Sequence, residues 1–146
     1  MKSKLITLLS LFTAVAFAHE GVELGPNKGR ILEFSKDETM HGEVIVKGDK
    51  FHIALLDKDM KAVAMTEQML TATTGERDKP VKLVVEKDAK GFVVPVVKAG
   101  EWLILQYKNT PKAKAVTARL EYNTATCEGC NKAEWLCECK KEEAKK

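Results

Sequence analysis

All four cysteines of this 146-residue chain lie in the thirteen-residue stretch CEGCNKAEWLCEC, which runs from Cys127 to Cys139. Their spacing is Cys127-x2-Cys130-x6-Cys137-x-Cys139. A Cys-x2-Cys pair is typical both of metal knuckles and of thiol redox pairs. Four thiolates could hold Zn²⁺ tetrahedrally, and two or three thiolates suit a soft ion such as Cu(I). The four cysteines are therefore candidate metal ligands, and Cys127 and Cys130 form the firmest pair.

Two other states of these cysteines stay open. An even number of cysteines in an exported chain favours disulfides, and the nested pairs Cys127–Cys139 and Cys130–Cys137 would staple a small loop. A bridge between Cys137 and Cys139 would be strained. The third state is a redox pair at Cys127 and Cys130, although such a pair normally lies on a βαβ scaffold.

The residues around the cysteines predict a helical tail. Asn131 and Glu134 match a capping box, and residues 132–146 are mostly good helix formers. On such a helix Cys137 and Cys139 would lie about 200° apart and would not face one ion, unless the helix begins only after Cys139. We therefore expect residues 123–146 to form a cysteine-rich appendage to a domain that folds without it.

The histidines are the other candidate ligands. Cleavage of a leader after Ala18 would make His19 the first residue, and its α-amine and imidazole together could chelate Cu(II). His41 is favoured over His52 as a partner for His19, because it begins a predicted strand near the N-terminal segment. The alternative is that both internal histidines are exposed or half-buried residues that bind no metal.

The N-terminus predicts export. Basic residues at positions 2 and 4, an apolar run from Leu5 to Phe17 and the site Ala16-Phe17-Ala18 match a secretory signal peptide over residues 1–18. No later run reaches the roughly 20 apolar residues of a membrane-spanning helix. The mature chain is expected in the periplasm or outside the cell. It would carry 22 basic and 21 acidic residues, a balance that argues against nucleic-acid binding.

Residues 29–122 predict an all-β domain, an antiparallel immunoglobulin-like β-sandwich, which a flexible segment over residues 19–28 precedes. Short runs with period two, separated by turn residues, predict the strands. These runs cover residues 29–34, 41–47, 50–57, 61–65, 68–74, 81–87, 91–97, 101–108 and 114–122.

The Gly48-Asp49 loop predicts a hairpin that pairs Lys47 with Lys50 and places Ile45 opposite His52. In this register His41 and His52 lie roughly 13 Å apart, so they should not share an ion. Trp102 is expected in the core. Alternation along the strands predicts the remaining core residues, which are Val44, Val46, Phe51, Ile53, Leu55, Val81, Leu83, Val85, Ile104, Val116, Ala118 and Leu120.

The segment LGPNKGRILEFSKDETMHGEVIVKGDKFHIALLDKDMKAVAM, from Leu24 to Met65, has a G-P-N-x-G-R opening, a strand that starts with His and a D-x-x-M-K-x-V ending. It resembles small exported β-domain proteins and the N-terminal segments of periplasmic adaptors from heavy-metal efflux systems. The resemblance implies a periplasmic β domain with a metal connection. Lys28 stands where those segments have glycine, and the adaptors' helical hairpin is absent, so the chain is not itself an adaptor.

The sequence contains no catalytic motif such as G-x-S-x-G, a phosphate-binding loop or H-E-x-x-H, and a non-enzymatic role is expected. The favoured function is a periplasmic metal-binding protein that sequesters or delivers copper or zinc, with a metal-efflux or envelope protein as candidate partner. The alternatives are an envelope interaction module with a disulfide-stapled tail, and a thiol–disulfide redox protein.

Overall fold

A computed structural model describes residues 22–139; residues 1–21 and 140–146 lie outside the described range, and with them the predicted signal peptide and His19. The described chain has nine strands and one short 3-10 turn, η1. Their bounds are β1 Arg30–Glu33, β2 Met40–Lys47, β3 Lys50–Asp57, β4 Met69–Glu76, β5 Lys79–Leu83, β6 Glu86–Lys87, β7 Phe92–Pro95, β8 Trp102–Lys108, β9 Val116–Glu121 and η1 Glu134–Leu136.

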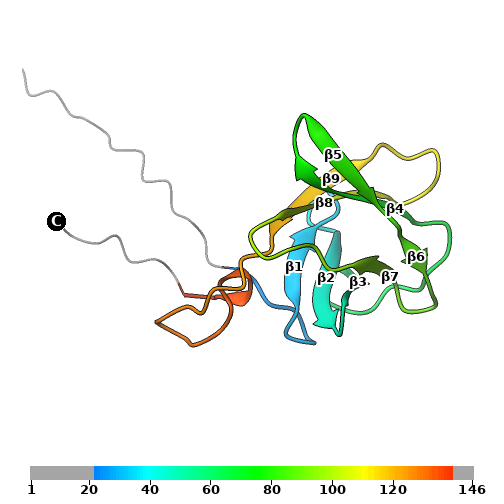
Figure 1. Cartoon of the computed structure of the whole chain (residues 1–146). Helices are drawn as coiled ribbons and strands as arrows, with labels where there is room; N and C mark the ends of the chain where they lie inside the picture. Colours follow the sequence, from blue (N-terminus) through cyan, green and yellow to red (C-terminus); the bar gives the residue numbers. More distant parts are fainter. Residues whose placement is uncertain (1–21, 140–146) are drawn as a thin grey trace, which may run out of the picture.

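The strands form two antiparallel sheets, which confirms the predicted all-β class and is consistent with a β-sandwich. The first sheet has the strand order β1-β2-β3-β7-β6, and the second has the order β5-β4-β8-β9. The chain crosses between the sheets after β3, β5 and β7. The tail, orange to red in Figure 1, follows β9 and lies at one end of the sandwich beside the start of the described chain.

The connectivity differs from that of the immunoglobulin fold. There the second and third strands of the chain belong to different sheets. Here β1, β2 and β3 are neighbours in one sheet, because the Gly48-Asp49 loop joins β2 directly to β3 as a hairpin. Gly48 has φ +61°, the left-handed conformation that glycine adopts without strain. The predicted register is confirmed, since Lys47 pairs with Lys50 and Ile45 with His52.

Two predicted strands are altered in the structure. The run 61–65 makes only an isolated bridge, between Ala62 and Leu56. The run 81–87 is divided between β5 and β6, because the chain passes from one sheet to the other between Leu83 and Glu86. Both runs have strand-forming residues, but only a neighbour of the right register turns such a run into a strand.

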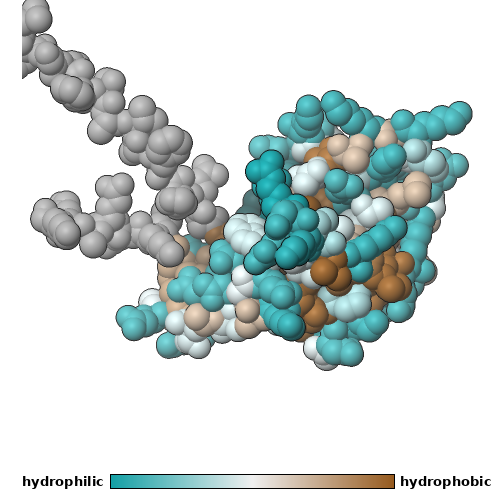
Figure 2. Space-filling model, turned by 45° about the horizontal axis from the view of Figure 1, so that its top comes forward, coloured by the Kyte–Doolittle hydropathy of each residue, from teal (hydrophilic) through white to brown (hydrophobic). Residues whose placement is uncertain are grey.

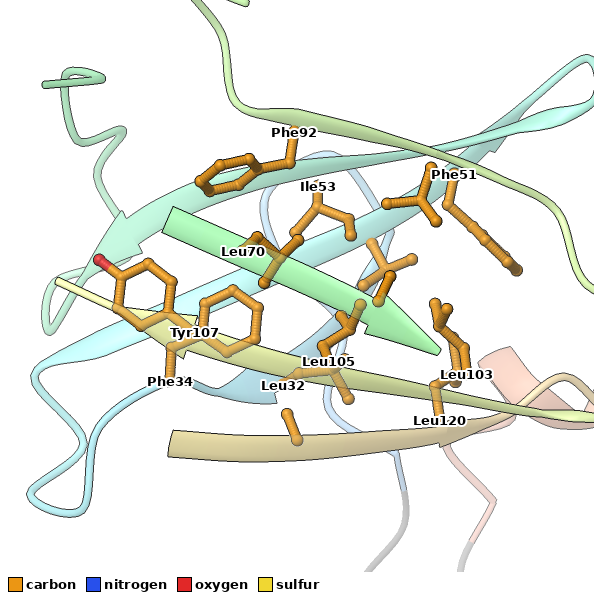
Figure 3. Close-up of a cluster of buried hydrophobic side chains, with 14 of the residues drawn as sticks. Leu32, Phe34, Phe51, Ile53, Leu70, Phe92, Leu103, Leu105, Tyr107 and Leu120 are labelled. Carbon is orange, nitrogen blue, oxygen red and sulfur yellow. The ribbon is translucent and has the colours of Figure 1, made fainter. Parts of the chain in front are cut away.

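The core lies between the sheets, and Figure 3 shows its leucines and aromatic rings meeting there. Phe34 stacks on Tyr107, with ring centroids 4.8 Å apart. Six predicted core residues are buried: Val44, Phe51, Ile53, Leu55, Ala118 and Leu120. Four more are partly buried: Val46, Leu83, Val85 and Val116.

The prediction was wrong for β8 and for Val81. Strand β8 turns Leu103, Leu105 and Tyr107 inward, so its alternate residues Trp102 and Ile104 face outward. Trp102 is 47% exposed and is not a core anchor. Val81 is also exposed, because β5 is an edge strand. Apolar type alone could not fix the direction of alternation in β8, since both of its faces carry large apolar residues.

A buried carboxylate fixes the loop that precedes β1. Glu43 of β2 is 1% exposed and accepts hydrogen bonds from the Asn27 backbone N–H (2.7 Å), the Asn27 amide (2.8 Å) and the Gly29 N–H (3.0 Å). A Cβ at Gly25 would lie 2.6 Å from the Glu43 carboxylate carbon, so only glycine fits. These contacts account for Gly25, Asn27 and Gly29 of the G-P-N-K-G sequence in structural terms.

The surface of the domain is mainly hydrophilic on the face seen in Figure 2, where hydrophobic side chains form smaller areas among charged ones. Within the described range, no helix has the length and apolar character that a membrane crossing requires.

Candidate metal centre

Backbone hydrogen bonds give the tail a defined turn in place of the predicted helix. Thr126 and Ala133 form an antiparallel bridge, and the Cys127 N–H donates to the Lys132 carbonyl at 2.8 Å. The chain between them turns back on itself, with the Asn131 N–H donating to the Cys127 carbonyl at 2.8 Å. The turn brings the second pair of cysteines back toward the first.

The helical tail was therefore wrong for residues 132–139. Asn131 does not cap a helix; it has φ +57°, the left-handed conformation that Asn tolerates better than most residues. The helical content of this part is the single turn η1, Glu134–Leu136, and Cys137 after it is extended. Good helix formers are not sufficient in so short a segment, because an isolated helix of that length is marginal in water.

The four cysteine sulfurs converge on one point. All four Sγ atoms lie within 4.8 Å of one another. The Sγ of Cys137 is 3.2 Å from that of Cys127 and 3.6 Å from that of Cys130. The expectation that Cys137 and Cys139 would point in opposite directions is wrong, because both follow η1 outside any helix and Cys137 is extended. The sulfurs of the second pair lie beside those of the first.

The geometry suits a metal ion. A Zn–S bond of about 2.3 Å in a tetrahedral site places neighbouring sulfurs roughly 3.8 Å apart, within the spread of the observed distances. Within residues 22–139 the four cysteines are free, and no other group of three or more His, Cys, Asp or Glu side chains brings its ligand atoms together in this way. The nested disulfides stay an alternative that thiol analysis tests.

The protein supplies hydrogen bonds to the sulfurs. The Cys137 thiol donates to the Cys127 sulfur, and the backbone N–H groups of Cys130 and Gly129 add to it; together they lower the pKa of Cys127 to about 7. The same shared proton raises the pKa of Cys137 to about 12. The Cys139 N–H reaches the Cys137 sulfur at 3.4 Å. Without metal, Cys127 thus becomes a thiolate far more readily than Cys137 does.

Two further contacts lie beside the cysteine loop. Lys132 Nζ lies 2.7 Å from Glu138 Oε2, and this exposed ion pair links the segment after Cys130 to the residue after Cys137. The bond to Glu138 and the nearby sulfurs raise the pKa of Lys132. At Gly129 a Cβ would lie 3.3 Å from the Cys139 sulfur, so the knuckle approaches that sulfur closely.

Trp135 anchors the cysteine loop in the domain core. It is 5% exposed and packs edge-on against Tyr122 and Phe51, at centroid distances of 5.4 and 6.3 Å. The backbone N–H of Trp135 donates to the Asn123 carbonyl (3.0 Å), and the backbone carbonyl of Trp135 accepts from Arg30 Nη1 (3.2 Å). The tail thus contributes a core residue two positions before Cys137. That the domain folds without the tail stays a prediction.

A groove of about 820 Å³ opens beside the sulfurs. Three of the four cysteines line it, and Cys130 does not. The exposed indole of Trp102 lies along it, opposite Glu121 in the β8–β9 register. The Val22 N–H donates to the Cys137 carbonyl at 3.3 Å, so the start of the described chain also reaches this site.

Neither of the two described histidines, His41 and His52, belongs to the cysteine cluster. His41 is 4% exposed, and its Nδ1 lies 3.0 Å from Glu33 Oε1, so a carboxylate occupies one of its nitrogens. His52 is half-buried, and the β2–β3 register keeps it four positions from the partner of His41. His19 lies outside the described residues, and its role as a chelate stays a prediction.

No family model matches the chain, and neither the curated proteins nor the solved structures include one with significant similarity to it. The resemblance of residues 24–65 to efflux adaptors stays a prediction. The candidate function consequently depends on the geometry of the site.

Sequence reasoning missed the residues that hold the cysteine loop. Trp135 did give a signal, since Trp135-Leu136 is an apolar pair inside an otherwise polar segment. Arg30 and Glu121 gave none, because only the tertiary packing of β1 and β9 brings them to the cysteines.

Proposed function

We propose that this protein binds a soft transition-metal ion, copper or zinc, at Cys127, Cys130, Cys137 and Cys139, and that it sequesters or delivers that ion. The observation that carries the proposal is the convergence of the four sulfurs within 4.8 Å. Thiolates prefer Cu(I) and Zn²⁺, whereas Mg²⁺ and Ca²⁺ prefer oxygen ligands. Backbone N–H groups directed at the sulfurs would offset part of the negative charge of a four-thiolate site.

The place of action in this proposal is the periplasm or the cell exterior. The signal-peptide pattern of residues 1–18 supports export. The resemblance of residues 24–65 to segments of heavy-metal efflux adaptors supports a metal-efflux or envelope protein as the partner. After cleavage His19 would supply a separate N-terminal chelate, and His41 would join it only by giving up its bond to Glu33.

Metal binding at the cysteine loop should also affect the stability of the β domain. Cys137 is two residues from Trp135, which packs in the main core, and its carbonyl accepts the N–H of Val22. Ligation of Cys137 and Cys139 therefore holds the segment that carries Trp135. Because a ligand that binds only the folded state stabilises it, metal binding should raise the stability of the whole domain.

Metal and thiol analysis of the purified mature protein tests the proposal. We expect one ion per chain by native mass spectrometry and four free thiols after chelation. Cys130→Ala should reduce the metal content strongly. The matched control His52→Ala changes a soft-metal ligand type outside the cluster and should keep the ion. Two disulfides and no metal in protein isolated from the envelope would refute the proposal.

One observation favours thiol–disulfide exchange as a second candidate. Cys127 has a pKa lowered to about 7 chiefly by the Cys137 thiol, whose sulfur lies 3.2 Å away. This partner differs from Cys130, the one expected from the sequence. If Cys127 and Cys137 form a disulfide that a mild dithiol reduces reversibly, and if no ion binds, the redox function replaces the metal function.

A further inference from the structure

The groove beside the cysteine cluster has an unusual combination of an exposed indole and carboxylates. Trp102 is 47% exposed on the outer face of the second sheet, and none of the ring pairs found in residues 22–139 includes it. Trp is one of the residue types enriched at interaction hot spots. Its indole lies along the same groove as three of the four sulfurs.

The charge of the groove is negative. Glu121, Glu128 and Glu134 line it, against the single guanidinium of Arg30. Arg30 is already engaged, because it donates to the Trp135 carbonyl and is attracted to Glu121. A divalent ion together with its four thiolates would carry a formal charge of about −2, and the same site with a monovalent ion would be more negative. The metal-loaded groove therefore favours a positively charged occupant.

We propose that this groove docks a cationic, thiol-bearing segment of a partner protein, which exchanges the metal ion with the cysteine cluster. This inference rests on the proposed function and specifies its partner. Lys or Arg side chains of the segment would face the glutamates and the Trp102 indole, which attracts cations through its π face. Its cysteine would approach the ion from the side that three of the sulfurs line.

The exchange is a ligand substitution without electron transfer. A thiolate of the partner forms a bond to the ion while one groove-side cysteine sulfur leaves it. The proton from the partner's thiol goes to the departing thiolate, through water, so the charge of the protein–ion pair is conserved. Repeated substitution transfers the ion. The same steps in reverse load the protein, and the cationic flanks accelerate both directions by steering the encounter.

Two peptide probes test this inference on the metal-loaded mature protein. Both have the same length and one Cys-x2-Cys pair, flanked by lysines in one and by glutamates in the other. We expect the lysine peptide to remove the ion at least tenfold faster at low ionic strength in stopped-flow measurements. The ratio should approach one at about 1 M salt, where the screening length falls to roughly 3 Å. Equal rates at low salt would overturn the inference.

Variants assign the effect to the groove. Glu121→Gln with Glu128→Gln should reduce the ratio of the two rates severalfold, while the metal content stays at one ion. Glu76→Gln, an exposed glutamate on the β4–β5 hairpin, is the matched control and should leave the ratio unchanged. Trp102→Ala should weaken binding of the lysine peptide in saturation kinetics. If the double variant keeps the full ratio, the docking site is not this groove.

The inference and the proposed function fail in different ways. A protein that holds one ion but shows no preference between the peptides keeps its metal function and loses the docking groove. A protein that binds no ion loses both, because no exchange then exists to be steered.

Discussion

Replacing Trp135 by Ala tests whether the cysteine loop belongs to the domain core. The side chain is 5% exposed and contacts the rings of Phe51 and Tyr122. Truncation of a buried Trp costs about 3–5 kcal/mol, and the loss of two edge-on ring contacts places this site in the upper part of that range. Since a domain is stable by roughly 5–15 kcal/mol, Trp135→Ala should remove a large part of the total.

The assay is urea unfolding of the metal-free, reduced protein, followed by far-UV circular dichroism, which reports the strands of the sandwich. The midpoint should fall strongly while the slope stays nearly constant. Trp102→Ala is the matched control, because it removes the same side chain from a site 47% exposed. Its cost should be about 1 kcal/mol or less. Equal midpoints for wild type and Trp135→Ala would show that the tail is detachable after all.

The same experiment with metal measures the coupling between the ion and the core. At a free metal concentration 100 times the dissociation constant, binding should add about 2.7 kcal/mol to the stability of the wild type. Trp135→Ala should weaken metal binding as well, because the loop would lose its anchor. Metal that binds tightly without raising the unfolding midpoint would contradict the coupling.

Three further predictions concern single contacts. Iodoacetamide should alkylate Cys127 of the metal-free protein with a half-maximal rate near pH 7, because the fold lowers the pKa of this thiol from 9.0 to about 7. The stability that this pKa shift contributes is fully present above pH 9 and is lost as pH falls through 7. A half-maximum near pH 9, by peptide mass spectrometry, would contradict this. Glu43→Gln should cost about 1–3 kcal/mol in urea unfolding, because its amide NH2 replaces the oxygen that accepts from the Asn27 amide, so that two donors face each other in a buried site. Exposed Glu76→Gln should change stability by under about 0.5 kcal/mol. Lys132→Gln breaks an exposed ion pair and should cost less than about 1 kcal/mol by the same assay; a larger cost would show that the pair fixes the loop.

The β2–β3 hairpin shows what local sequence can predict. Its two-residue loop fixes the pairing, and the alternating residues of both strands then define which side is buried, so Val44, Phe51 and Ile53 were found. Strand β8 shows the limit. Trp102 and Ile104 are as apolar as their neighbours Leu103 and Leu105, and only the position of the opposite sheet decides which set is inside.

The candidate site was also only partly predictable. The four cysteines were found as candidate ligands from their type and number. Their arrangement was not, because the predicted helix separated Cys137 from Cys139. The left-handed backbone at Asn131 and the Thr126–Ala133 bridge are local features. The position of the cysteine loop also depends on the contact of Trp135 with Tyr122, which is more than ten residues away in the sequence.

The sequence by itself determined the all-β class, the central hairpin and the set of thiols, since these follow from turn residues, period-two alternation and residue type. The tertiary structure alone decided that four sulfurs meet within 4.8 Å and that a core tryptophan holds them there. It also decided which residues surround the sulfurs, because β1, β8 and β9 bring Arg30, Trp102 and Glu121 together from distant parts of the chain. The reason is physical: side-chain type and local backbone preference act over a few residues, whereas the convergence of a site is set by the packing of segments that are far apart in sequence.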